Sequence, residues 1–215
     1  MAQIFPQWTN KLPVIIAAAA LIAVMAVVGF FWYFGSPKYT DVGYRPVQPI
    51  PYSHKLHAGD LGIDCRYCHY SVEYSASANV PPTSVCMNCH QLILPQSEKL
   101  LPVRESWATG RPIEWIRVHK IGEYAYFNHS IHLDRGVGCN SCHGNVAQME
   151  IVGQKRPLSM GWCLDCHRNP APHLRPAQEV TNTSWVPPDD HGEYAARIIE
   201  EKGILPPEVC SACHR

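Results

Sequence analysis

Residues 127–143, FNHSIHLDRGVGCNSCH, contain the pattern on which the organisation of the whole chain depends. Cys139 and Cys142 are separated by two residues, a spacing that lets both thiols add to the vinyl groups of one haem. His143 follows directly and can ligate the haem iron. These residues therefore predict a site for one covalently bound haem c.

Two further histidines precede the cysteines in the same stretch. His129 and His132 are three residues apart, so a helical turn projects both side chains to nearly the same side. We expect one of them to complete the coordination of this haem iron and the other to ligate the iron of a neighbouring haem.

The remaining cysteines repeat the motif. All ten cysteines of the 215-residue chain fall in five Cys-x-x-Cys-His motifs, and none is left over. Structural zinc sites and disulfides also use paired cysteines, but neither chemistry needs a histidine after every pair. The sequence therefore predicts five haem c groups with five proximal histidine ligands. The motifs are Cys65, Cys68 and His69; Cys86, Cys89 and His90; Cys139, Cys142 and His143; Cys163, Cys166 and His167; and Cys210, Cys213 and His214.

The composition narrows the class of protein. The apolar fraction of 46% is that of a globular protein, and 18 Lys and Arg balance 18 Asp and Glu. The chain has no run of basic residues that would bind phosphates, so nucleic acid is not an expected partner. With little polypeptide available per haem, we expect the porphyrins to form much of the core. The predicted fold is a mainly irregular and α-helical multihaem domain with little β structure.

An apolar segment near the N-terminus predicts attachment to a membrane. Residues 14–34 contain no polar interruption and are flanked by Lys11 and Lys38. As a helix this segment is about 31 Å long, which matches the apolar core of a bilayer. A cleaved signal peptide and a buried helix of a soluble domain are the alternatives. The run is longer than the usual signal-peptide core and no small-x-small cleavage site follows, so we predict an uncleaved anchor over residues 14–35.

The same segment predicts the localisation. Attachment of haem to thiols requires an exported chain, so we expect residues 1–13 in the cytoplasm and the haem domain on the periplasmic side of the cytoplasmic membrane. The protein would cross the lipid bilayer once. Residues 36–51 contain four prolines and predict an extended, semi-rigid spacer.

The haem domain, residues 52–215, contains an internal repeat. Residues 52–57, YSHKLH, align with residues 127–132, FNHSIH, at an offset of 75 residues. The cysteines follow in step. We therefore predict one two-haem module over residues 52–118, a second over residues 119–175, and a fifth haem within residues 176–215.

Seven histidines lie outside the motifs, and five irons need a distal ligand. The predicted distal ligands are His54, His57, His119, His129 and His132. His173 and His191 lie in polar or proline-rich surroundings, where a solvated histidine is the default. Met149 and Met160 are alternatives for one iron, because a thioether ligand raises the potential, although most methionines simply pack in a core.

Arginines provide candidate partners for the propionates of five haems. The candidates are Arg66, Arg111, Arg117, Arg135, Arg168 and Arg175.

Three segments outside the motifs have local secondary-structure signals. Residues 96–108 predict a short helix that is interrupted at Pro102 and stopped by Gly110. Residues 115–118 alternate in part and predict a strand-like segment. Residues 191–202 predict a helix behind a capping aspartate.

The module pattern resembles a known class. An aromatic residue followed by x-His-x-x-His ahead of Cys-x-x-Cys-His is similar to the class III multihaem cytochromes c. This resemblance implies that the first histidine ligates the haem just downstream and that the second ligates a different haem.

Nearly the whole chain resembles the pentahaem cytochrome c subunit (ActA) of alternative complex III. The resemblance rests on the anchor, the five motifs and the runs at residues 112–119, 126–132 and 160–170, which read PIEWIRVH, YFNHSIH and MGWCLDCHRNP. It implies an electron-transfer subunit that is not an enzyme by itself. Its electrons would come from menaquinol, oxidised at polytopic membrane subunits, through an iron–sulfur subunit that is similar to molybdopterin oxidoreductases. The acceptor would be a monohaem cytochrome c, another soluble protein or a terminal oxidase.

Three other functions remain open. A quinol dehydrogenase of the NapC/NirT type also has one anchor and four or five haems, but it typically has a methionine shortly after the first motif, where this chain has Tyr70, Ser71 and Val72. The related multihaem subunit of a menaquinone reductase complex would conduct electrons in the opposite direction. A multihaem reductase of nitrite or a similar oxyanion would need a five-coordinate haem.

Overall fold

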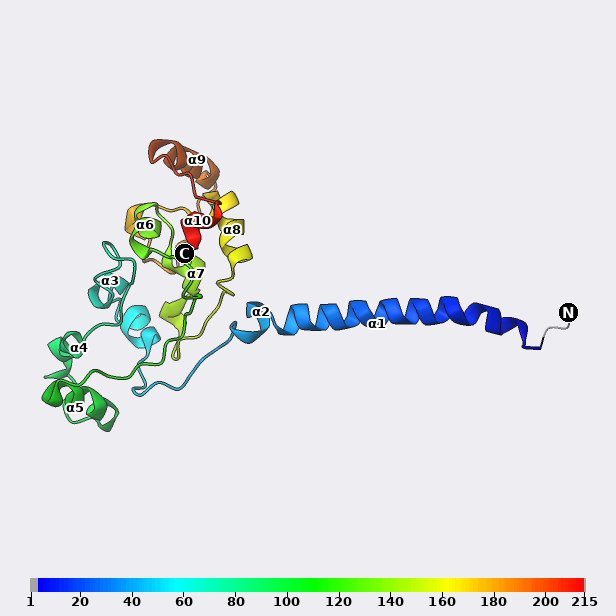
Figure 1. Cartoon of the computed structure of the whole chain (residues 1–215). Coiled ribbons are helices and arrows are strands. Elements are labelled where there is room, and N and C mark those ends of the chain that lie inside the picture. The colour runs from blue at the N-terminus through cyan, green and yellow to red at the C-terminus, as the bar shows by residue number, and fades with distance from the viewer. Residues whose placement is uncertain (1–3, 215) are drawn as a thin grey trace. The chain divides into compact units, whose positions relative to one another are not determined.

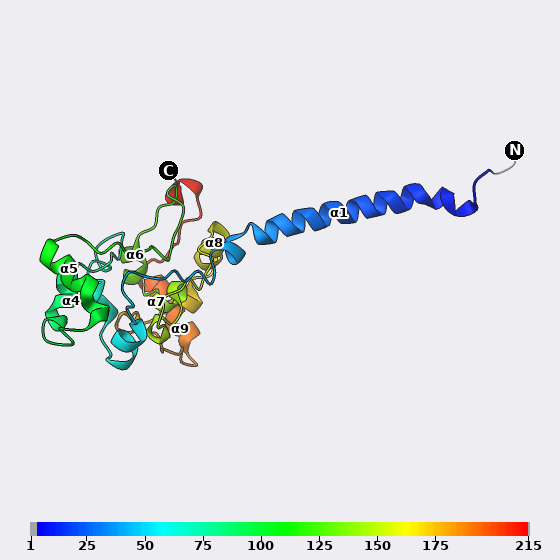
Figure 2. The same cartoon turned by 90° about the horizontal axis from the view of Figure 1, so that it is seen from below.

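The computed structural model describes residues 4–214, and the chain divides into two compact units, Met1–Asp41 and Val42–Arg215. The described residues form helices and irregular segments and contain no strand (Figure 1 and Figure 2). Two isolated bridges pair Ala125 with His214 and Val137 with Leu174. The expected fold class, helical and irregular with one N-terminal apolar helix, is confirmed.

Ten α-helices lie within residues 4–214, and most are short. They are α1 (Leu12–Phe34), α2 (Pro37–Thr40), α3 (Cys65–Cys68), α4 (Thr83–His90), α5 (Leu101–Thr109), α6 (His129–Asp134), α7 (Cys139–His143), α8 (Met160–Arg168), α9 (His191–Glu201) and α10 (Cys210–Cys213). The other helical turns are η1 (Gln7–Lys11), the π-helical η2 (Lys55–Asp60), η3 (Glu98–Leu100), η4 (Val146–Gln148), η5 (Ala171–His173) and η6 (Ala177–Glu179).

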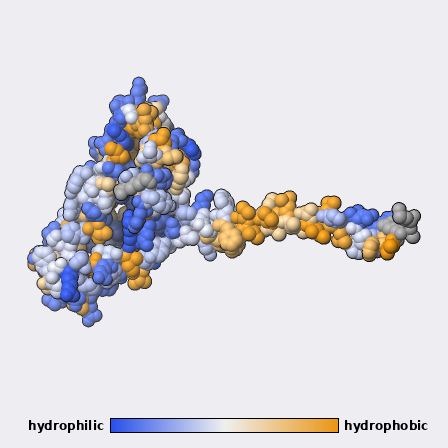
Figure 3. Space-filling view, viewed as in Figure 1, coloured by the Kyte–Doolittle hydropathy of each residue, from blue (hydrophilic) through white to orange (hydrophobic). Residues whose placement is uncertain are grey.

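The first unit consists mainly of α1, and hydrophobic residues line this helix along its length (Figure 3). Its 23 residues span about 35 Å at 1.5 Å per residue, and none of them is buried. Within residues 4–214 it belongs to the one helical stretch that is long and apolar enough to cross a membrane. By length and composition α1 is the predicted anchor, and it begins two residues before the predicted start.

The predicted spacer is only partly extended. Pro37–Thr40 form the helical turn α2, where the proline composition predicted an extended chain. The cause is local packing, because the Tyr39 ring lies 4.7 Å from the ring of Phe34 at the end of α1.

In the second unit the cysteines of all five motifs lie on helices. The paired cysteines are three positions apart on α3, α4, α7, α8 and α10, and residues with this spacing face the same side of a helix. Short helices therefore present both thiols of each motif in one direction, which attachment to a single porphyrin requires.

The apolar core of the second unit is small. Nine apolar side chains are buried among residues 4–214, and the one cluster that they form contains Ile50, Met87 and Val103. This cluster packs α4 against α5, which lie side by side in both cartoon views (Figure 1 and Figure 2). So few buried side chains fit a chain that packs around attached porphyrins.

Two local predictions are wrong. Residues 115–118 form no strand. Instead the Gln48 side chain donates to the carbonyl of Ile116 at 2.8 Å and accepts from its N–H at 2.9 Å, so one amide provides the hydrogen bonds of a strand partner. Pro102 lies in the first turn of α5 and does not interrupt it, because the first helical positions need no N–H donor.

The ends of two predicted helices are confirmed. Gly110 ends α5 in the left-handed conformation, with φ 71°, as expected for a helix-terminating glycine. The helix predicted over residues 191–202 is α9, although the side chain of Asp190 at its N-cap makes no capping hydrogen bond.

Candidate functional site

Three pairs of histidines have their rings at closely similar separations. The ring centroids are 6.2, 6.4 and 6.3 Å apart for His57 and His90, His129 and His143, and His132 and His167. Two imidazoles bound through Nε2 on opposite sides of one metal ion, each at about 2.0–2.1 Å, place their ring centroids about 6.3 Å apart. Each pair joins one motif histidine with one predicted distal histidine, so the residues fit the two axial ligands of a haem iron.

The hydrogen bonds of these rings favour the tautomer that binds iron. A backbone carbonyl can only accept, so a histidine Nδ1 that contacts one carries the hydrogen and leaves the lone pair on Nε2. Six histidines, five of them members of the three pairs and the sixth the motif histidine His69, make this contact at 2.6–3.0 Å. The pairs are His57 with Ser53, His69 with Asn79, His90 with Ile93, His129 with Ala76, His132 with Asn128, and His167 with Pro207.

The sequence repeat is also a repeat of side-chain geometry. Tyr52 stacks on His57 at 4.5 Å with 21° between the ring planes, and Phe127 stacks on His132 at 4.6 Å and 27°. Each aromatic ring also meets the first histidine of its own pair edge-on, at 4.8 and 4.7 Å. In both predicted modules the aromatic residue therefore contacts the two histidines that follow it in the same way.

The repeat assigns a position to His54. It corresponds to His129, which lies opposite His143, so by analogy His54 is the predicted distal ligand opposite His69. Its Nδ1 is buried and has no hydrogen-bond partner among residues 4–214. Burial, followed by the charges of neighbouring histidines with His69 first, lowers the pKa of His54 to about 4. The ring is therefore neutral near pH 7, as a ligand must be.

His119 lies close to the third motif but not opposite it. Its ring is 4.3 Å from that of His143, edge-on at 81°, too near for an iron between them. Its Nε2 is buried and has no partner within the described part of the chain, which fits a ligand of another iron. At the fifth motif Tyr124 stacks on His214 at 5.8 Å. The distal ligand there stays a prediction.

The less favoured candidates have different surroundings. His191 Nε2 lies 2.7 Å from the carbonyl of Leu174, so that nitrogen carries the hydrogen and is not free for iron. Burial lowers the pKa of His173. Met149 is buried, and Met160 is exposed at the start of α8. Neither methionine is tested as a ligand.

The third motif is the most deeply buried. Burial raises the pKa of the Cys139 thiol to about 11 and that of Cys142 to about 12. Burial, followed by the charges of nearby histidines, lowers the pKa of His143 to about 3. Before haem attachment this site therefore holds uncharged thiols and a neutral imidazole.

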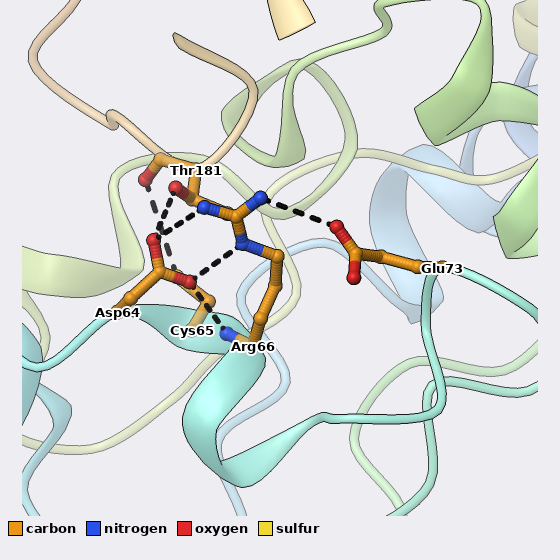
Figure 4. Close-up of polar contacts among 5 residues, drawn as sticks. All are labelled: Asp64, Cys65, Arg66, Glu73 and Thr181. Atoms are coloured by element: carbon orange, nitrogen blue, oxygen red, sulfur yellow. Dashed lines mark hydrogen bonds and ion pairs between the residues drawn. The ribbon is translucent and has the colours of Figure 1, made fainter. Parts of the chain in front are cut away.

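A polar cluster anchors the first motif (Figure 4). The carboxylate of Asp64 caps α3 by accepting from the backbone N–H of Arg66 at 2.8 Å, and it accepts from the Arg66 guanidinium and from the Thr181 hydroxyl, both within 3.1 Å. The guanidinium also reaches Glu73 at 3.2 Å. These bonds, with Arg66 as the largest cause, lower the pKa of Asp64 to about 2. Arg66 is thus already paired within the protein.

Several partners of the motifs had no sequence signal. The carbonyls of Ala76 and Asn79, in one loop, accept from His129 and His69 respectively, and any residue type supplies a carbonyl. Asp64, directly before Cys65, is a residue type that favours the N-cap, so the sequence does contain a signal for this contact.

The helical fold, the haem motifs and the histidine geometry support the class of multihaem c-type cytochromes, which bind haem c covalently. It is similar to the multihaem cytochrome c subunit of menaquinone reductase from Nitratidesulfovibrio vulgaris (strain Hildenborough), with 29% identity over 185 residues that cover 75% of this chain and 82% of the relative. No protein-family model matches the chain. The similarity supports the class and does not single out alternative complex III.

Proposed function

We propose that this chain is a membrane-attached electron-transfer subunit with five haem c groups, in a complex that exchanges electrons with menaquinone. The observation that carries the proposal is the set of three histidine pairs with ring centroids 6.2–6.4 Å apart. An iron with histidines on both sides has no position open for a substrate, which favours electron transfer over catalysis.

The chain's own residues perform the positioning. Haem c, when bound, supplies a one-electron redox couple. The motif histidines would hold each iron from one side, and the upstream histidines would keep water and substrates from the other. The Nδ1 hydrogen bonds fix the orientation of the ring and increase the basicity of Nε2.

The relative supports a multisubunit assembly, because its name describes one subunit of a menaquinone reductase. The proposed partners are polytopic quinol-binding membrane subunits, an iron–sulfur subunit that is similar to molybdopterin oxidoreductases, and a monohaem cytochrome c or another electron carrier. In this proposal α1 crosses the cytoplasmic membrane and the haem domain lies on the periplasmic side.

Two directions of electron flow are compatible with this geometry. The relative is named for reduction of menaquinone, whereas the runs at residues 112–119, 126–132 and 160–170 resemble the complex that oxidises menaquinol. Assays of the purified complex decide between the two directions. If the complex oxidises menaquinol, added menaquinol should reduce the haems. If it reduces menaquinone, chemically reduced haems should convert added menaquinone to menaquinol.

The first test concerns the assembly. Membranes are extracted in mild detergent and separated on a native gel with haem staining, and every protein that migrates with the 24.1 kDa chain is identified. The proposal expects a large assembly with iron–sulfur and polytopic membrane subunits. A chain that migrates alone and is reduced by menaquinol unaided would instead be a dehydrogenase of the NapC/NirT type.

A further inference from the structure

Arg175 is a buried guanidinium beside the third haem motif. Its side chain is 6% exposed, and no carboxylate of residues 4–214 forms an ion pair with it. It packs directly on Gly138, the residue before Cys139, because a Cβ added there would clash with the guanidinium carbon. A buried guanidinium that forms no ion pair among the described residues therefore lies against this motif.

Neutral groups hold the guanidinium in place. It donates to the Asn140 side-chain oxygen at 2.7 Å and to the carbonyl of Asn182 at 3.0 Å. It also lies over the Trp185 ring, 4.7 Å from the centroid. Asn140 stands between the two cysteines of the motif, so Arg175 contacts the helix α7 that would carry the haem.

The segment that Arg175 contacts, residues 180–182, also joins the third motif to the first. The carbonyl of Val180 accepts from the backbone N–H of Cys139 at 2.9 Å. The next residue, Thr181, donates to Asp64 at 2.8 Å, and its carbonyl lies 4.0 Å from the sulfur of Cys65. Through Asn182, Arg175 fixes a segment that lies between one motif of each module.

A positive charge that water does not screen favours any nearby process that adds negative charge. Reduction of an iron is such a process, and charge and burial are among the means by which a protein sets a haem potential. We propose that the positive charge of Arg175 raises the reduction potential of the haem that Cys139, Cys142 and His143 would bind. This inference rests on the proposed function in requiring a haem there.

The test compares variants of the full chain in its complex by redox titration followed by electron paramagnetic resonance. Arg175→Gln is expected to lower the midpoint potential of one haem, with all haems still covalently attached. Arg175→Lys, which keeps the charge, is expected to restore most of that potential. The affected haem is identified as the third because His129→Ala should remove its low-spin signal.

Arg168 provides the matched control. It lies beside the fourth motif, but its side chain is 59% exposed and is paired with Glu208 at 3.0 Å, so solvent and the partner screen its charge. Arg168→Gln should leave the potential of the third haem unchanged. Equal shifts in Arg168→Gln and Arg175→Gln would overturn the inference, as would unchanged potentials in Arg175→Gln.

A second variant covers failure of Arg175→Gln to assemble. Asn140→Asp places a carboxylate against the guanidinium, keeps the contact and neutralises the charge, and should lower the same potential. Unchanged potentials in this variant also overturn the inference. If the wild-type protein has no haem at the third motif, the proposed function fails; if it has five low-spin haems and the variants shift none, only this inference fails.

Discussion

At the scale of single residues, the distal histidines allow the most direct test of the ligand assignment. His57 and His132 lie opposite His90 and His167 at iron-spanning separations. We expect His57→Ala and His132→Ala each to convert one haem from low to high spin, because one axial ligand is lost while the thioether bonds remain. Absorption and electron paramagnetic resonance spectra measure the spin state, and mass spectrometry counts the attached haems.

The control for both variants is His191→Ala. The Nε2 of His191 contacts the carbonyl of Leu174 at 2.7 Å and is not available to an iron, so its loss should leave the spectra unchanged. Unchanged spectra in both His57→Ala and His132→Ala would refute the ligand assignment.

Asp64 provides a prediction about pH. The pKa of Asp64 is about 2 in the folded protein, below its ordinary value of 3.8. The negative charge of Asp64 therefore stabilises the fold above pH 4, and this contribution is lost as the pH falls towards 2. Because the side chain is 42% exposed, we expect Asp64→Asn to lower the free energy of unfolding by only about 0.5–1 kcal/mol at pH 7. Guanidinium unfolding at pH 7, 5 and 3 measures the difference.

Asp64→Ala separates the charge from the cap. Asparagine also caps helices well, whereas alanine does not, so Asp64→Ala should cost more than Asp64→Asn at every pH. A difference between wild type and Asp64→Asn that grows as the pH falls would contradict the assignment.

At the scale of elements, α6 shows how local sequence positions the ligands. The side-chain oxygen of Asn128 caps this helix by accepting from the Ser130 N–H at 3.0 Å. The backbone carbonyl of Asn128 accepts from the Nδ1 of His132. Asn128→Ala should destabilise the protein by about 1 kcal/mol, and Asn128→Ser should restore most of this loss. Thermal or guanidinium unfolding measures both, and an alanine variant as stable as the wild type would show that the cap is unimportant.

Elements that depend on local sequence were predictable, and those that depend on distant partners were not. The helical fold, the stop at Gly110 and the α9 helix follow from neighbouring residues. Residues 115–118 were misassigned because the partner of Ile116 is Gln48, 68 residues away. Likewise the carbonyls that orient His69 and His129 come from a loop whose residue types contain no ligand signal.

At the scale of the whole molecule, contacts connect the five motifs in an order that differs from the sequence. The order of contact is second, first, third, fourth and fifth. The second motif contacts the first directly. The first motif is joined to the third by the loop after the first motif and by the segment 180–183. The contacts that join them are Asn88 with Tyr67, His129 with Ala76, Cys139 with Val180, and Arg168 with Glu208. The third and fourth motifs are related through α6, whose His129 and His132 rings lie 6.4 and 6.3 Å from the rings of His143 and His167. The sequence repeat predicted two modules but not the contacts that join them.

The division into two units predicts the effect of removing the anchor. Val42–Arg215 form a compact unit of their own and contain all five motifs, whereas α1 has no buried residue. We expect residues 42–215, exported behind a cleavable signal, to be found in the soluble fraction with the same number of haems and the same spectra as the full chain. Replacing α1 with an unrelated membrane-spanning helix should return the protein to the membrane, because only apolar length is required. If the truncated chain stays with the membrane after a high-salt wash, partner subunits hold it there and α1 is not its main attachment.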